Sequence, residues 1–148
     1  MHSIDLFWPA VVLFLWTQLV VLRLATLRFR AVREQRVDPR YYKAFRGDGE
    51  PADVAVVSRH LVNLYEAPTL FYAGVAIAIA IDVERSRELL IALAWVYVAL
   101  RMLHSLIHLT LNKVIWRFRV FAASWIVLLF FWIVLTGQVV SGAAIATS

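Results

Sequence analysis

Three polar side chains recur at helical spacing within a stretch that is otherwise mostly apolar. Arg59, Asn63 and Glu66 stand at positions i, i+4 and i+7, which places them on one face of an α-helix. Ionisable residues within an apolar helix cost at least ~2.5 kcal/mol each on membrane-insertion scales, and they usually face the interior of a helix bundle or a polar cavity. We therefore expect this face to line a site.

A second apolar stretch carries a matching set of polar side chains. Arg101, His104 and His108 stand at i, i+3 and i+7, again on one helical face. If the two helices run antiparallel, Glu66 lies at the depth of Arg101, and Arg59 at that of His108. We expect a Glu66–Arg101 ion pair, because an uncompensated buried charge costs several kcal/mol. Together the two faces predict a polar, net positive cavity.

The composition indicates that lipid surrounds most of this chain. Of its 148 residues, 62% are apolar and 17% are charged, whereas a water-soluble domain is about half apolar and a quarter charged. A net charge of +5 would otherwise suggest nucleic acid as a partner, but the apolar excess argues against it. The chain has no cysteine, so any thiol chemistry needs a thiol that the ligand supplies.

Four runs are long and apolar enough to cross a bilayer as helices, which takes about 20 residues each. They cover residues 6–27, 54–81, 89–111 and 120–140 and are separated by charged segments. The longest such segment, 28–53, contains Asp-Pro, Gly-Asp-Gly and Glu-Pro and reads as ordered surface or a short interfacial helix. The sequence predicts an all-α, integral membrane four-helix bundle forming a single domain over residues 1–148.

Cationic residues predict the orientation of the four spans. Segment 28–53 is rich in arginine, and Lys113, Arg117 and Arg119 lie between the third and fourth spans. The positive-inside rule makes both segments cytoplasmic and both termini external. The first apolar run has its cations after it rather than before it, so we expect no cleavable signal peptide. We expect a multi-pass protein of a bacterial inner membrane, with the cavity opening toward the cytoplasm.

Structural alternatives exist for several of these residues. The Glu66–Arg101 pair could serve only to fix helix register, and Arg28 and Arg119 could be boundary residues that reach for the headgroups. His104 and His108 have the i, i+4 spacing of helical zinc motifs. His60 and His108 could likewise hold a haem. Because no third ligand follows at a matching spacing, we expect no metal.

The two polar faces also carry the motif of a known family. The chain resembles the MAPEG family (membrane-associated proteins in eicosanoid and glutathione metabolism), and the resemblance covers essentially the whole chain. The residues that carry it are Arg59, Asn63, Glu66 and Pro68 in the second span, Arg101 and His104 in the third, and Arg117, sixteen positions after Arg101.

The resemblance implies a homotrimer that binds glutathione between adjacent subunits, near the cytoplasmic side. Arg117 matches the arginine credited with stabilising the glutathione thiolate. Arg28 matches an arginine that meets a glutathione carboxylate. The positions that match other glutathione-binding residues are Arg59, Asn63, Glu66, Arg101 and His104.

Glutathione suits these side chains chemically. It carries two carboxylates, one ammonium and one thiol, so its site needs several cations, one acid and a group that favours thiolate. Arg28, Arg59 and His108 can serve the carboxylates, and Glu66 the ammonium. A guanidinium stabilises thiolate over thiol, and Arg117 is the candidate.

Two departures from the family pattern bear on activity. His108 stands where eicosanoid-forming relatives carry a tyrosine, and Phe118 where prostaglandin-E-forming relatives carry a serine. The loss of both hydroxyls argues against prostanoid isomerisation but leaves glutathione binding intact. We expect a glutathione-dependent transferase or peroxidase acting on a small lipophilic electrophile. The alternative is a non-catalytic membrane module that binds a lipid or an anionic ligand, or regulates a partner.

Overall fold

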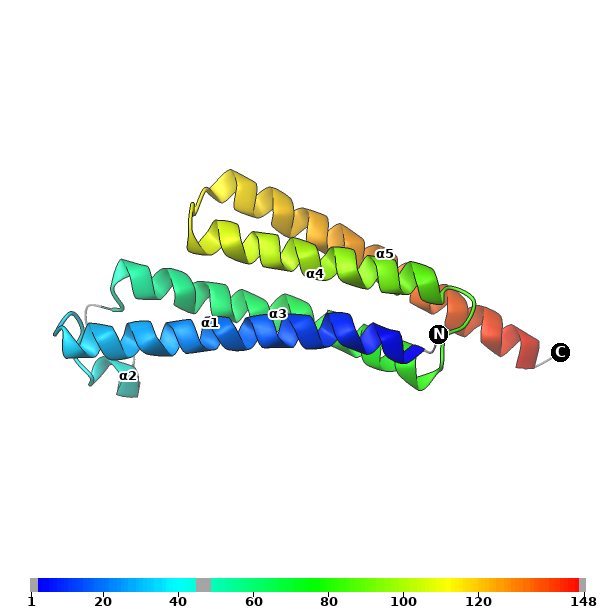
Figure 1. Cartoon of the computed structure of the whole chain (residues 1–148), viewed down its shortest axis with the longest axis horizontal. Helices are drawn as coiled ribbons and strands as arrows, with labels where there is room; N and C mark the ends of the chain where they lie inside the picture. Colours follow the sequence, from blue (N-terminus) through cyan, green and yellow to red (C-terminus); the bar gives the residue numbers. More distant parts are fainter. Residues whose placement is uncertain (1–2, 45–48, 147–148) are drawn as a thin grey trace.

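The computed structural model describes residues 3–44 and 49–146, and within them the regular secondary structure is entirely helical, without strands. A 3-10 turn, η1 (Ser3–Leu6), leads into α1 (Phe7–Arg33), which is followed by the short α2 (Tyr41–Ala44). Three long helices complete the chain: α3 (Ala52–Ala80), α4 (Arg87–Leu109) and α5 (Val114–Ala146). The two ends of the chain lie at the same end of the bundle, as four spans require (Figure 1).

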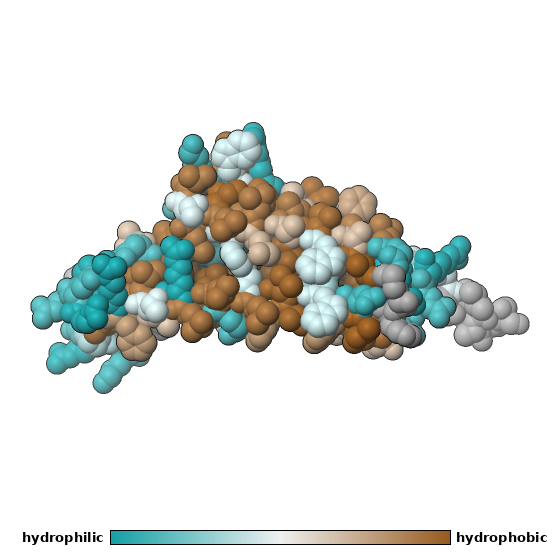
Figure 2. Space-filling view, viewed as in Figure 1, coloured by the Kyte–Doolittle hydropathy of each residue, from teal (hydrophilic) through white to brown (hydrophobic). Residues whose placement is uncertain are grey.

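The four long helices confirm the predicted membrane spans. Segments Ile4–Arg33, Ala52–Ala80, Arg87–Leu109 and Val114–Ser141 are each long and apolar enough to cross a bilayer. Figure 2 shows an apolar body with hydrophilic residues gathered at both ends, as a membrane-spanning bundle needs. The chain is therefore an integral multi-pass membrane protein.

Three helix boundaries differ by six residues from those that hydropathy predicted. α1 continues to Arg33 rather than stopping near residue 27. α5 begins at Val114 rather than near residue 120, and it ends at Ala146 rather than near residue 140. Backbone hydrogen bonds continue the helix past the hydrocarbon boundary, and arginine side chains there reach into the headgroup region. Because α5 begins this early, only a short turn separates it from the end of α4. Arg117 consequently lies in the first turn of a helix.

The four helices form two hairpin-like pairs, α1 with α3 and α4 with α5 (Figure 1). All four helices share one core at the end of the bundle where the termini lie. There Phe71 stacks on Tyr97 with ring centroids 4.7 Å apart and meets Phe131 edge-on at 6.0 Å. The second core, around Val57 and Leu64, joins α1 chiefly to α3. At that end α4 meets α3 through the hydrogen bond between His60 Nε2 and the Ser105 hydroxyl, and Leu109 of α4 packs against the second core.

Ion pairs connect segment 34–51 to the ends of α1 and α3. Arg28 donates to Glu50 at 2.7 Å, and Arg36 donates to Asp53 at 3.0 Å. The Arg30 and Arg36 guanidiniums hold the pKa of Glu34 below its ordinary value, mainly through the hydrogen bond from Arg30. The described parts of this segment, 34–44 with α2 and 49–51, are therefore ordered surface, as the sequence predicted.

Candidate functional site

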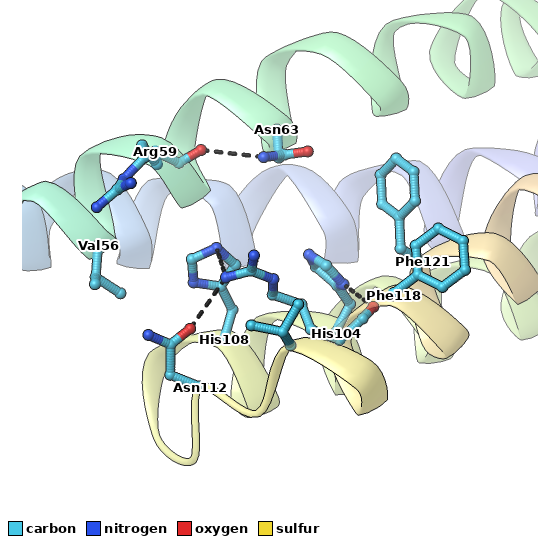
Figure 3. Close-up of a pocket in the computed structure, with 10 residues that line it drawn as sticks. Val56, Arg59, Asn63, His104, His108, Asn112, Phe118 and Phe121 are labelled. Atoms are coloured by element: carbon cyan, nitrogen blue, oxygen red, sulfur yellow. Dashed lines mark hydrogen bonds between the residues drawn. The ribbon is translucent and has the colours of Figure 1, made fainter.

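A cavity of about 370 Å³ opens between α3 and the hairpin formed by α4 and α5. Its volume falls in the range of small-molecule sites, roughly 300–1,000 Å³. The polar residues that line it are Arg59 and Asn63 from α3, His104 and His108 from α4, Asn112 from the turn and Arg117 from α5. Val56, Val114, Phe118 and Phe121 complete the wall. Figure 3 shows the α3 residues facing those of the α4–α5 hairpin across this space.

Arg117 is the most highly connected residue of the cavity. Its Nη1 donates to Asn112 Oδ1 at 3.0 Å and to His108 Nε2 at 3.2 Å, and its backbone carbonyl accepts from His104 Nδ1 at 3.1 Å. A guanidinium can only donate and a carbonyl can only accept, so His108 carries no proton on Nε2 and His104 carries one on Nδ1. Arg117 thereby fixes the orientation of both imidazoles.

The α3 side of the cavity supplies a second cation. Arg59 is exposed, and its Nε donates to the carbonyl of Ala55 at 3.3 Å. Asn63 donates its amide to the carbonyl of Arg59 at 3.2 Å, which leaves the amide oxygen free to accept from a ligand. Among the described residues that line the cavity, two are arginines and none is a carboxylate. The site therefore favours an anionic ligand.

Arg101 lies directly behind the cavity and is completely buried. Its Nη2 donates to the backbone carbonyl of Asn63 at 3.0 Å, and its guanidinium lies 5.6 Å from the ring centroid of Phe121. The antiparallel alignment of the two polar faces is thus confirmed. The predicted ion pair with Glu66 is wrong for this chain, because Glu66 is exposed on α3 and makes no salt bridge with Arg101.

The packing of α3 explains why Glu66 points outward. The buried positions of this helix include Val57, His60, Leu64, Ala67 and Phe71, which follow each other at three- or four-residue spacing. The predicted polar face lies one residue to the side of this buried face, at the edge of the bundle. Arg59 and Asn63 can still line a cavity from that edge, whereas Glu66 faces away from α4.

Arg28 is likewise not brought into the cavity. Its guanidinium donates to Glu50 at 2.7 Å and to Ser58 at 3.0 Å, and it lines a separate, mainly apolar cavity of about 340 Å³ beside α1. Of the predicted site residues, the structure groups Arg59, Asn63, His104, His108 and Arg117 around one cavity, with Arg101 behind it. Glu66 and Arg28 lie elsewhere within a single chain.

Two residues of this region were not predicted as part of the site: His60, which the sequence suggested only as a haem ligand, and Asn112. His60 is fully buried, hydrogen-bonded through Nε2 to the hydroxyl of Ser105, and lies 4.9 Å from the His108 ring by centroid distance. Its place on the buried face of α3 could have identified it. Asn112 has a positive φ of 46°, and an asparagine after a helical pattern is a known signal for such a helix end.

Three histidines, His60, His104 and His108, lie close together beside the cavity. Over the described ranges, no group of three or more His, Cys, Asp or Glu side chains is placed to hold a metal ion. The Nε2 atom of His60 contacts the Ser105 hydroxyl, and the Nε2 atom of His108 accepts from Arg117.

The donor set fits glutathione in the respects that a single chain can test. Two exposed or half-exposed guanidiniums, an amide and two imidazoles surround a space of suitable size. Buried nitrogens of Arg101, His104 and His108 have no hydrogen-bond partner in the described structure, so the layer behind the cavity has unused hydrogen-bonding groups, of which those of Arg101 are donors.

Comparison with known proteins agrees with the motif and the fold. The family model of the MAPEG family matches residues 6–137, which is nearly the whole chain. No curated protein and no solved structure matches the chain in the same comparisons. Proteins of this family are embedded in membranes and generally use glutathione as a co-substrate. With the four spans and the cationic cavity in place, the conclusion is that the chain belongs to the MAPEG family.

Proposed function

We propose that this protein is a glutathione-dependent transferase or peroxidase that acts on a lipophilic electrophile within the membrane. The observation that carries the proposal is the pair of guanidiniums, Arg59 and Arg117, on opposite walls of a cavity whose described lining has no carboxylate. Such a site attracts a ligand with several negative groups, and arginine can bind each carboxylate with two parallel hydrogen bonds.

The two guanidiniums have different tasks in this proposal. Arg59 and Asn63 bind a carboxylate end of glutathione from α3, and Arg117 faces the sulfur from α5. A cation beside a thiol lowers its pKa from about 8.5, as for cysteine, and so increases the fraction of thiolate. The proton released from sulfur goes to water at the open side of the cavity.

The thiolate then attacks the electrophile. With an aromatic halide, a carbon–sulfur bond forms, the carbon–halogen bond breaks, and halide leaves. With a lipid hydroperoxide, two glutathione molecules are oxidised to the disulfide while the hydroperoxide is reduced to an alcohol and water. Phe118 and Val114 are each 67% exposed at the edge of the cavity, so an apolar substrate meets apolar side chains on its way from the bilayer.

A homotrimer would complete the site. Glu66 is a charge on an exposed face of a membrane-spanning helix, where a lipid contact is costly. A neighbouring subunit that covers this face would remove Glu66 from lipid and allow it to receive the glutathione ammonium. Arg28 of one subunit would then bind a carboxylate at the cavity of the next.

We assign the end of the bundle that holds the cavity to the cytoplasm of a bacterial inner membrane. The arginine-rich segment 28–53 and the α4–α5 turn lie at this end, and both termini lie at the other, external end (Figure 1). This places the cavity on the side where glutathione is made.

A second candidate function is binding without turnover. It is favoured by the contacts of Arg117, whose Nη1 is already shared between Asn112 and His108, and by Phe118, which offers no hydroxyl beside it. In this case the cavity holds glutathione or another anion to regulate a partner.

The test is glutathione affinity by calorimetry together with conjugation of a generic aromatic halide, on protein purified in detergent. Arg117→Ala should lower conjugation about 10²-fold or more, the usual effect of removing one transition-state donor. The matched control is Arg119→Ala, since Arg119 stacks on Trp116 at 5.3 Å and is absent from the cavity lining. Saturable binding without turnover would establish the second candidate, and an intact trimer without binding would refute both.

A further inference from the structure

Asn112, in the turn between α4 and α5, contributes to the backbone conformation of the turn and also contacts Arg117 in the cavity. Asn112 has a left-handed φ of 46°, and its backbone N–H donates to the carbonyl of Ile107 at 2.7 Å, which closes the end of α4. Asparagine is one of the few residues other than glycine that adopt this conformation readily. Glycine, however, has no side chain with which to contact Arg117.

Arg117 is held on one side only. Its Nη1 donates to Asn112 Oδ1 at 3.0 Å and to His108 Nε2 at 3.2 Å, whereas Nε and Nη2 make no hydrogen bond within the described structure. These two nitrogens form the fork of the guanidinium that faces a planar or compact anion. The contacts on Nη1 therefore fix the plane of the side chain and leave its binding edge open.

Both acceptors on Nη1 are neutral. Asn112 offers an amide oxygen, and His108 offers an unprotonated ring nitrogen. No salt bridge of Arg117 occurs among the residues that the structure describes. A carboxylate in the place of Asn112 would hold the guanidinium equally well, but it would cancel the positive charge that a thiolate needs.

We propose that Asn112, with His108, is a positioning residue that orients Arg117 through neutral acceptors, so that the guanidinium keeps its full charge for an anionic sulfur. The inference rests on the proposed function and extends it to a residue that does not itself touch the sulfur. Asn112 acts through Arg117.

Two substitutions separate the positioning role from the role in the turn. Asn112→Gly keeps the left-handed backbone and removes the acceptor, whereas Asn112→Asp keeps an acceptor and adds a charge. The control is Gln35→Gly, because Gln35 also has a left-handed φ, 56°, at the end of α1 and is absent from the cavity lining. All variants are made in the full chain and reconstituted in nanodiscs.

The first readout is a pH titration of bound glutathione, followed by the ultraviolet absorbance of its thiolate. Asn112→Asp should raise the pKa of the bound thiol by about 1 unit or more, since a carboxylate now neutralises Arg117. Conjugation near neutral pH should fall about tenfold with it. Gln35→Gly should titrate like the parent protein. An unchanged titration in Asn112→Asp would overturn the inference.

The second readout does not depend on glutathione. Nitrogen NMR of labelled arginine, with the Arg117 signal assigned by its loss in Arg117→Lys, reports how fast the guanidinium rotates. We expect slow rotation in the parent protein and fast rotation in Asn112→Gly. Equal rotation in both would refute the positioning role. If rotation differs but no glutathione binds, the contact of Asn112 with Arg117 stands and the proposed function fails.

Discussion

Gly74 of α3 packs directly against Phe131 of α5, and a larger side chain at this position should destabilise the bundle. A Cβ atom at this position would lie 2.9 Å from Cε1 and 3.4 Å from Cδ1 of the Phe131 ring. The ring cannot withdraw easily, because Phe131 is 1% exposed and packs edge-on against Phe71. Gly137, on α5, provides the matched control, since a Cβ atom there has no neighbour within 4 Å.

The magnitude follows from the difference between the two glycines. Replacing glycine by alanine within a helix stabilises it by about 0.5–1 kcal/mol, and this gain applies at both positions. Overpacking a filled core costs about 1–3 kcal/mol, and this cost applies only at Gly74. Gly74→Ala should therefore be less stable than Gly137→Ala by about 1–3 kcal/mol, in free energy of unfolding.

The assay is unfolding of the detergent-solubilised protein by sodium dodecyl sulfate, followed by circular dichroism. The double variant Gly74→Ala/Phe131→Leu should recover part of the loss, because leucine leaves room for the new methyl group. Equal stability of Gly74→Ala and Gly137→Ala would refute the assigned α3–α5 contact. So would a failure of Phe131→Leu to relieve the loss in the double variant.

Three further predictions concern other polar contacts. Ser105→Ala should lower the unfolding free energy by about 1–3 kcal/mol, because it leaves His60 without its buried partner; detergent unfolding would show no change if that bond were unimportant. Glu50→Gln should lower the unfolding free energy by about 1 kcal/mol or less in the same assay, because Arg28 is 35% exposed and solvent screens its ion pair with Glu50. A loss of stability well above this value would mean that the ion pair is shielded from solvent. Burial, aided by the Glu50 carboxylate, raises the pKa of Tyr42, so the stability that neutral Tyr42 contributes is complete below about pH 10 and is lost at higher pH. Comparing Tyr42→Phe with the parent protein by ultraviolet titration of tyrosine checks this, and a Tyr42 that ionises at its ordinary pH would contradict it.

The membrane-spanning fold could be predicted because its signal is spread over many residues. A helix needs about 20 apolar residues to cross the bilayer, however the helices pack. The chain has four such runs, and charged segments separate them. The helix ends were less predictable. An apolar run in the sequence shows only how much of a helix lies in the hydrocarbon layer. The backbone of α1 continues as helix beyond its apolar run, to Arg33.

The polar cavity could be predicted in part. Helical spacing was sufficient to group Arg59 and Asn63 on one face and to place Arg59 at the depth of His108. It could not decide which side of α3 would pack, because that depends on residues such as Phe71 that fit against α4 and α5. The residues of the polar face stand one position before the buried residues of α3, so this face lies at the edge of the bundle rather than in its interior. For this reason Glu66 is exposed.

The contacts of Arg117 could not be obtained from spacing at all. They depend on where α5 begins and on the left-handed conformation of Asn112, which together turn Arg117 back toward His108. Local turn geometry of this kind depends on tertiary packing as well as on residue type.

The most direct test of the proposed site is an experimental structure of the protein in nanodiscs with glutathione bound. We predict glutathione in the cavity between α3 and the α4–α5 hairpin, with its sulfur within hydrogen-bond distance of the Arg117 fork and a carboxylate on Arg59. Glutathione bound elsewhere, or bound here with its sulfur away from Arg117, would contradict the proposal.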